Sequence, residues 1–183
     1  MSARRAEHVS LRGRLIQVIA WFVIAALVLL LAVSVVVPRI AGATPYTILT
    51  GSMQPGMPPG TLVVVRPVDF SDIGIGSVIT YQLESGRRTV VTHRVVAVGT
   101  NLKGEPFVET RGDANDVADE KPVIPAQVRG ERWYHLPYVG YAVNLFPQGE
   151  RQVALVVVVI GLLGYAATMA VGSVRDRRAG VSR

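Results

Sequence analysis

Two long apolar runs frame a region in which short apolar stretches alternate with turn residues. The first run, Leu15 to Val37, holds 23 residues, of which only Gln17 and Ser34 are polar. At a helical rise of about 1.5 Å per residue it would extend roughly 35 Å, and the hydrocarbon core of a bilayer measures about 30 Å. The pattern therefore predicts a transmembrane helix over residues 15–37.

The second apolar run, Val153 to Val171, contains no charged residue and predicts another transmembrane helix, over residues 153–173. Gly164, Thr168 and Gly172 recur in it every four residues. Small residues at this spacing favour close packing of one membrane helix on another.

Residues 44–146, between the two runs, show a β pattern. Short stretches rich in β-branched and aromatic residues are separated there by Gly, Pro, Asp and Asn, and none has a helical period. We therefore expect a mostly β protein, in which a small antiparallel β domain is flanked by two transmembrane α-helices. The predicted strands are Thr61–Val65, Ser77–Gln82, Thr89–Val98, Pro106–Arg111 and Gln127–Trp133.

Charge is concentrated at the two ends of the chain. The segment 1–14 carries four arginines against the single acid Glu7, and arginines recur in residues 174–183. Basic flanks tend to remain on the cytoplasmic side, so both tails are expected in the cytoplasm. The formal net charge of +6 then reflects membrane topology and not a nucleic-acid surface. The chain is expected in the cell membrane as a multi-pass protein, with the β domain outside.

Two further features concern the lipid bilayer. Ala41-Gly42-Ala43 resembles a small-x-small cleavage site, so a cleavable signal peptide is the alternative to the first helix. The apolar run exceeds the usual 7–15 residues of a signal peptide core, which favours an uncleaved helix.

Aromatic residues gather just before the second run, as at a membrane interface, although a β core can also hold them. They are Trp133, Tyr134, Tyr138, Tyr141 and Phe146.

The segment 50–60, TGSMQPGMPPG, comes soon after the first apolar run and has the composition of a rigid turn. Gly51 gives the backbone unusual freedom at its own position. Pro55 and the pair Pro58-Pro59 then restrict the backbone of the segment that follows Gly51. Such a turn can present the Ser52 hydroxyl beside backbone N–H groups. The alternative is a plain Pro/Gly connector between a membrane anchor and a soluble domain.

The chain holds three histidines, of which His93 lies in a predicted strand with Val91 and Val95 on the same face. A lone histidine there is commonly a satisfied core residue. Three acids come after it in residues 110–119: Asp113, Asp116 and Asp119. This loop can equally be solvated, and its spacing is not the alternate-residue pattern of a calcium loop. The chain has no cysteine, so disulfides and thiolate chemistry are excluded. No metal or cofactor is expected either.

Ser52, His93 and the Asp113/Asp119 loop together offer a nucleophile, a base and an orienting acid. At this point the chain resembles signal peptidase I. Residues 50–55 and 60–65 resemble the serine box of that family, and residues 92–95, THRV, resemble the box that holds the general base. A histidine there is similar to the branch of the endoplasmic reticulum, archaea and some Gram-positive bacteria. The segment 76–81 resembles another box, with Ser77 in place of the usual aspartate, and 111–115 with Asp119 resembles the aspartate box.

The resemblance implies a serine endopeptidase that removes signal peptides from secretory preproteins, with the translocon as a candidate partner. It assigns Ser52 as nucleophile and oxyanion donor, and His93 as general base. Asp119 would be the triad acid, with Asp113 a second aspartate close by, and Thr50 a second oxyanion donor. Shallow substrate pockets for small residues are expected at four residues flanking the serine and the histidine: Ile48, Leu49, Val90 and Val91.

Two other functions remain open from the sequence. One is a lysine-dependent serine peptidase that uses Lys103 or Lys121, although both lie in Gly/Pro-containing stretches with the character of exposed loops. The other is a non-enzymatic membrane-anchored β domain for binding or assembly, with Ser52 in a linker. The sequence does not indicate an oligomeric state, the preproteins that are cut or any accessory subunit.

Overall fold

The computed structural model describes residues 3–144 together with residues 157, 161, 164, 165 and 168. The last five of these residues are helical. The rest of the predicted helix 153–173 lies outside the described residues, as do Phe146 and the basic tail 174–183. The chain divides into two units, one comprising Val33–Leu145 and the other the two terminal segments.

The N-terminal helix confirms the helix expected from the first apolar run. It comprises α1 (Ala3–Leu31), a π-helical segment (Ala32–Val36) and α2 (Val37–Ile40). Within the described residues it is the one helix long and apolar enough to cross a membrane, over Leu15–Ile40. The small-residue segment after it forms the helix end, where Ala41 and Ala43 donate backbone hydrogen bonds to Val37 and Pro38.

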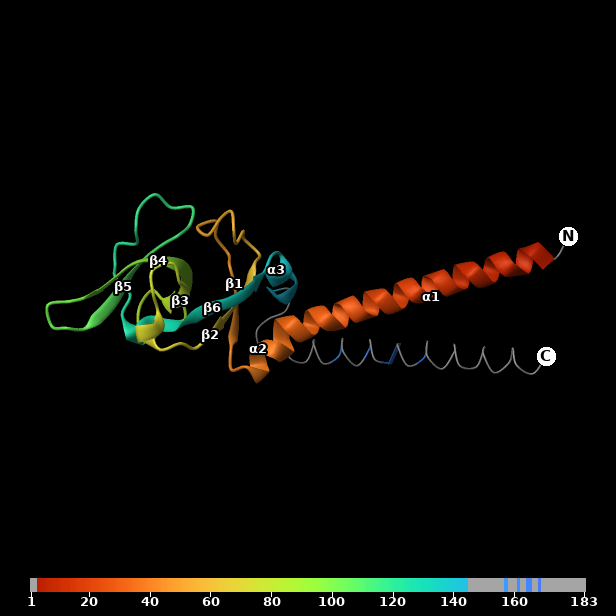
Figure 1. The fold of residues 1–183 in the computed structure, drawn as a ribbon, viewed down its shortest axis with the longest axis horizontal. Coiled ribbons are helices and arrows are strands. Elements are labelled where there is room, and N and C mark those ends of the chain that lie inside the picture. The colour runs from red at the N-terminus through yellow and green to blue at the C-terminus, as the bar shows by residue number, and fades with distance from the viewer. Residues whose placement is uncertain (1–2, 145–156, 158–160, 162–163, 166–167, 169–183) are drawn as a thin grey trace. The chain divides into compact units, whose positions relative to one another are not determined.

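A six-stranded antiparallel sheet forms the body of the second unit (Figure 1). Its spatial order is β1-β2-β6-β3-β4-β5, so the last strand, β6, inserts between β2 and β3 and joins the two halves of the sheet. A short helix, α3 (Val139–Asn144), comes after the last strand. The strands are β1 (Thr44–Thr47), β2 (Leu62–Arg66), β3 (Val78–Gln82), β4 (Val90–Thr100), β5 (Pro106–Arg111) and β6 (Val128–Leu136).

All five strands predicted from the sequence are present, with ends shifted by up to three residues. β1 and α3 were not predicted from the sequence. β1 has four residues, one of them Pro45, and lies at the sheet edge, where a residue without an N–H is tolerated. α3 has six residues, too few for a helical period to stand out.

Two buried clusters pack against the sheet, and the alternation of neighbouring strand residues separates them. Val78 belongs to the first cluster and Ile79 to the second, as expected for consecutive residues that face opposite sides of a strand. The first, here called the serine-side cluster, contains Ile48, Met53, Met57, Val63, Val65 and Val78. The second, here called the histidine-side cluster, contains Ile73, Ile79, Tyr81, Val95, Val108 and Val123.

Candidate active site

The turn that carries Ser52 is held by its own side chains. Met53 and Met57 are fully buried in the serine-side cluster, while Ser52 stays half-buried beside them. The backbone closes into helix-like turns, because Gln54 donates to the Gly51 carbonyl at 3.0 Å and Met57 to that of Met53 at 2.9 Å. The position of the serine hydroxyl is therefore set by the core and not by a free linker.

His93 links this turn to the acidic loop. The residue lies in β4, pairs with Ile79 of β3, and has a side chain that is buried to about nine-tenths. Its Nε2 atom lies 3.1 Å from the Ser52 hydroxyl oxygen, and its Nδ1 atom lies 2.7 Å from Oδ2 of Asp119. Three residues far apart in the chain thus form one continuous hydrogen-bonded series.

Asp119 is held at both its backbone and its carboxylate. Its N–H donates to the Thr110 carbonyl at 2.8 Å, which folds the loop after β5 back toward β4. Its Oδ2 atom accepts from the Thr110 hydroxyl at 2.6 Å and from the Tyr81 hydroxyl at 3.0 Å, in addition to His93. Burial raises the pKa of this carboxyl, but the hydrogen bonds from His93, Thr110 and Tyr81 outweigh it, so the net pKa lies below its usual value.

This arrangement selects one form of the imidazole. A carboxylate accepts only, so the Nδ1–H of His93 donates to Asp119 and the Nε2 lone pair faces the Ser52 hydroxyl. Burial raises the pKa of Tyr81 to about 12, with the Asp119 carboxylate adding to the increase. Tyr81 therefore stays a neutral donor at physiological pH. The geometry can remove a proton from a serine hydroxyl and stabilise the imidazolium that results.

Asp113 occupies a different position, although the sequence analysis placed it near the site as a second aspartate. Its two oxygens accept from Nε and Nη2 of Arg94, both at 2.8 Å, and Nη1 of Arg94 donates to the Gly76 carbonyl at 2.9 Å. The hydrogen bond from Arg94 lowers the pKa of Asp113. Asp113 thus ties the acidic loop to β4 and to the turn before β3.

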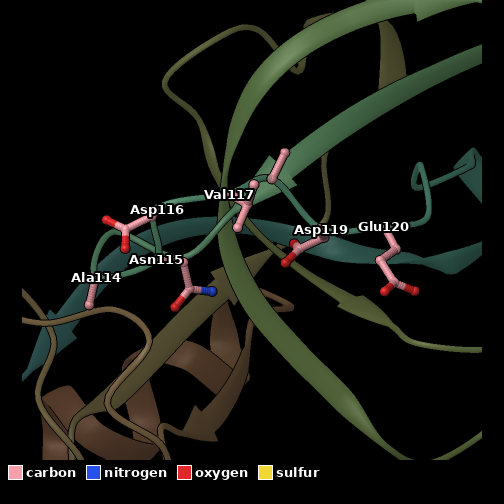
Figure 2. Close-up of a pocket in the computed structure, with 7 residues that line it drawn as sticks. Ala114, Asn115, Asp116, Val117, Asp119 and Glu120 are labelled. Atoms are coloured by element: carbon pink, nitrogen blue, oxygen red, sulfur yellow. The ribbon is translucent and has the colours of Figure 1, made fainter.

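The acidic loop also contacts the serine turn directly. Ala114 donates its N–H to the Ser52 carbonyl at 2.9 Å. In Figure 2 the side chains of Asp116 and Asp119 lie at separate places along this loop, with Val117 between them. Asp116 is exposed, whereas the carboxylate of Asp119 is bonded to His93.

The predicted oxyanion donor Thr50 lies beside the serine. Its hydroxyl oxygen is 3.3 Å from that of Ser52, and the residue is exposed.

The predicted pocket residues fall in different environments. Ile48 is buried in the serine-side cluster, whereas Leu49 is 76% exposed. Val90 and Val91 are half-buried, and Val91 borders a cavity of about 400 Å³ that also touches His93 and Asp119.

The two lysines of the alternative mechanism take no part in the hydrogen bonds of the Ser52 hydroxyl. Lys103 is exposed in the turn between β4 and β5. Lys121 is exposed and borders the same cavity as Asp119. The hydroxyl of Ser52 is bonded to His93 and Thr50.

Comparison with known proteins shows which proteins the chain is similar to. The family model described as "Signal peptidase, peptidase S26" matches residues 16–102, which include Ser52 and His93. Over these residues the chain is similar to the signal peptidase S26 family. It is 33% identical over 126 residues to "Signal peptidase I W" of Bacillus subtilis, covering 64% of this chain and 65% of that protein.

Two eukaryotic relatives extend the comparison. "Signal peptidase complex catalytic subunit SEC11" of Plasmodium falciparum is 28% identical over 129 residues, covering 64% of this chain and 68% of the relative. Human "Signal peptidase complex catalytic subunit SEC11C" is 31% identical over 104 residues, covering 51% of this chain and 52% of the relative. The chain thus spans about half to two thirds of the length of these relatives.

Three residues that hold this site together were not predicted from the sequence: Tyr81, Thr110 and Arg94. A partial signal exists for Tyr81, since it shares the β3 face of Ile79, the residue paired with His93. Thr110 immediately precedes the box at 111–115, and Arg94 is the next residue after His93. Nothing in their spacing indicates which acid each would contact.

Proposed function

We propose that this chain is a membrane-bound serine endopeptidase that removes N-terminal signal peptides from secreted preproteins. The observation that carries the proposal is the series Ser52–His93–Asp119, with 3.1 Å and 2.7 Å between the bonded atoms, in a chain whose residues 16–102 match the signal peptidase family model. An isolated serine hydroxyl is a weak nucleophile, and this series provides the base and the orienting carboxylate that activate it.

In the acylation step, the Ser52 hydroxyl oxygen attacks the carbonyl carbon of the scissile peptide bond while Nε2 of His93 accepts the hydroxyl proton. The Asp119 carboxylate stabilises the imidazolium through the Nδ1–H bond and does not take the proton itself. The tetrahedral intermediate then breaks its C–N bond, and the imidazolium gives its proton to the departing amine, the new N-terminus of the mature protein.

In the deacylation step, His93 removes a proton from water, which attacks the ester carbonyl carbon. The bond from that carbon to the Ser52 oxygen then breaks, the imidazolium returns its proton to the serine oxygen, and the signal peptide leaves with a free carboxyl group. The Ser52 N–H and the Thr50 hydroxyl are the proposed donors to the oxyanion in both steps. Each such donor typically lowers the barrier by on the order of 3 kcal/mol. The Thr50 hydroxyl is within 3.3 Å of the Ser52 oxygen, which supports its part in this role.

Asp113 is assigned to the frame of the site and Asp119 to the triad. The support is the division of partners, since Asp119 bonds to His93 and Asp113 bonds to Arg94. Because both carboxylate oxygens of Asp113 accept hydrogen bonds from the guanidinium, this side chain is held at Arg94 and does not orient His93.

Substrate recognition is assigned to the segments beside the serine and the histidine, residues 48–49 and 90–91. Leu49 is exposed and immediately precedes Thr50, and Val90 and Val91 lie half-buried at the start of β4. Small, shallow pockets formed by these residues would favour small side chains at positions −1 and −3 of a signal peptide. The buried Ile48 would shape such a pocket from beneath.

The membrane arrangement proposed is a cytoplasmic tail 1–14, a first span 15–37, an outer β domain 44–146, a second span 153–173 and a cytoplasmic tail 174–183. The support is the apolar helix over Leu15–Ile40 and the basic residues at both ends. Preproteins and the lipid bilayer are then the partners, and the translocon is proposed as a further one. An outer β domain would meet signal peptides as they emerge.

Incubation of the purified, detergent-solubilised chain with a labelled preprotein tests this function. We expect one cut, after the small residue at position −1, identified by mass spectrometry of the two products. A matched preprotein with phenylalanine at −1 should remain intact. Cleavage at scattered sites, or equal cleavage of both preproteins, would contradict a signal peptidase activity.

A further inference from the structure

Two buried hydroxyls surround the carboxylate oxygen that contacts His93. Thr110 is fully buried and Tyr81 is 3% exposed, and they belong to strands on either side of β4. Both reach Oδ2 of Asp119, and their own oxygens lie 3.0 Å apart. The hydroxyl oxygens of Tyr81 and Thr110 and the Nδ1 atom of His93 therefore all lie within hydrogen-bond distance of the same carboxylate oxygen.

The number of protons restricts how these contacts are made. Each hydroxyl has one proton, so Thr110 cannot donate to both Tyr81 and Asp119 at once. Either both hydroxyls donate to Asp119, or Thr110 donates to Tyr81 and Tyr81 donates to Asp119. In both arrangements Oδ2 accepts from a hydroxyl and from His93, which suits an ionised carboxylate and opposes a protonated one.

We propose that Tyr81 and Thr110 are positioning residues for the triad, which fix the Asp119 carboxylate so that His93 is held with its proton on Nδ1. Their hydroxyls are bonded to Asp119 and to each other, so both act on the triad through Asp119. This inference rests on the proposed function for its effect on turnover. Its structural part, the control of the His93 tautomer, does not depend on any substrate.

The geometry explains why two donors are needed. The acidic loop leaves β5 after Arg111 and folds back so that Asp119 bonds to the Thr110 backbone, with mostly exposed residues in between. A carboxylate on an exposed loop would rotate among several positions and accept from water. Donors fixed in β3 and β5 restrict Oδ2 to the place where Nδ1–H of His93 points, and hydrogen bonds to a charged acceptor are among the stronger ones in proteins.

The test uses the full chain in detergent with ¹⁵N-labelled histidine, because ring nitrogen shifts report which nitrogen carries the proton. Tyr81→Phe and Thr110→Val should each move His93 toward a mixture of tautomers at neutral pH. Each should also lower kcat for preprotein cleavage about tenfold, with KM within about twofold of the wild-type value, since the Michaelis complex is unaffected. Thr110→Ser, which keeps the hydroxyl, should restore both readouts.

Thr80→Val is the matched control. Thr80 is as fully buried as Thr110 and its hydroxyl is bonded at 2.7 Å to that of Thr92, away from Asp119. This variant also loses a buried hydroxyl, so it should lower thermal stability but leave the His93 tautomer and kcat unchanged. A change in tautomer or kcat equal to that in Thr110→Val would mean that general core damage is the cause and would overturn the proposal.

The remaining outcomes separate this inference from the proposed function. Folded Tyr81→Phe and Thr110→Val proteins that keep the Nδ1–H tautomer and wild-type kcat would overturn the positioning role, while cleavage itself stands. If the wild-type chain cleaves no preprotein, the proposed function fails, and the tautomer measurement still decides the positioning role. Tyr81→Phe retains its aromatic ring, so it decides the matter even where Thr110→Val does not fold.

Discussion

The backbone of Gly112 lies against the backbone of Ser52. A Cβ atom placed on Gly112 would come within 2.6 Å of the Ser52 carbonyl oxygen and 3.0 Å of the Ser52 Cβ atom. Real Cβ contacts essentially never reach the first of these distances, so only glycine allows the acidic loop this close to the serine turn. Contact between the two loops therefore depends on one missing side chain.

Gly112→Ala should displace the serine turn and reduce both stability and turnover. Overpacking of this kind costs about 1–3 kcal/mol, and a shift of about 1 Å in a reacting group can lower the rate about 100-fold. Thermal unfolding and cleavage kinetics measure the two effects. Gly56→Ala is the matched control. Gly56 lies in the serine turn itself, and a Cβ atom added there would have nothing within 4 Å. A Gly112→Ala enzyme with wild-type kcat would show that the loop contact does not position Ser52.

Asp119→Asn should fold normally and lose about 10⁴-fold in kcat, the size of the effect known for this change in a serine protease. The amide can donate to His93 and thereby favours the wrong tautomer. Asp113→Asn should instead lower the melting temperature, with a smaller loss of kcat, because it weakens the bidentate contact to Arg94. Melting curves and single-turnover rates of both variants test this. A stable, inactive Asp113→Asn beside an active Asp119→Asn would reverse the assignment.

Stability should decline on acidification below about pH 4 in part because of Asp113. Its hydrogen bond with Arg94 lowers the carboxyl pKa from 3.8, so its contribution is complete above the unfolded value and is lost as pH falls through the lower folded value. Asp113→Asn does not titrate, so its melting temperature should depend less on pH in this range. Asp116→Asn, at an exposed position of the same loop, is the control. Equal acid sensitivity in all three proteins would exclude this contribution.

The predicted topology can be tested by labelling single cysteines, because the chain has no cysteine of its own. An impermeant thiol reagent added to intact cells should modify a cysteine at Ser85, in the exposed turn between β3 and β4. Cysteines at Ser2 and Ser182 should react only after the cells are permeabilised. Labelling of Ser2 but not Ser85 in intact cells would place the β domain in the cytoplasm and contradict an outer peptidase.

The strands were predictable because their apolar alternation is local, and His93 could be placed between Val91 and Val95 for the same reason. Both valines do pack with the histidine-side cluster. The path of the acidic loop was not predictable, because it depends on the Asp119–Thr110 backbone bond and on the absence of a side chain at Gly112.

The choice between the two aspartates shows the same limit of local patterns. Both Asp113 and Asp119 lie near the end of β5 in the sequence, and only the fold brings Arg94 to one and His93 to the other. The carboxylate of Asp113 is bonded to the guanidinium of Arg94, a contact that the sequence of the loop does not indicate. The family resemblance favoured Asp119, and the hydrogen bond to His93 adds geometric support.

The most direct test of the account is the initial rate of preprotein cleavage by purified variants that fold normally. Ser52→Ala should show no cleavage above the blank, and His93→Ala should lose several orders of magnitude, because members of a triad act as a unit. Lys103→Ala and Lys121→Ala should stay near the wild-type rate. Wild-type cleavage by Ser52→Ala would contradict the proposed nucleophile, and loss of cleavage in either lysine variant would favour a Ser-Lys peptidase.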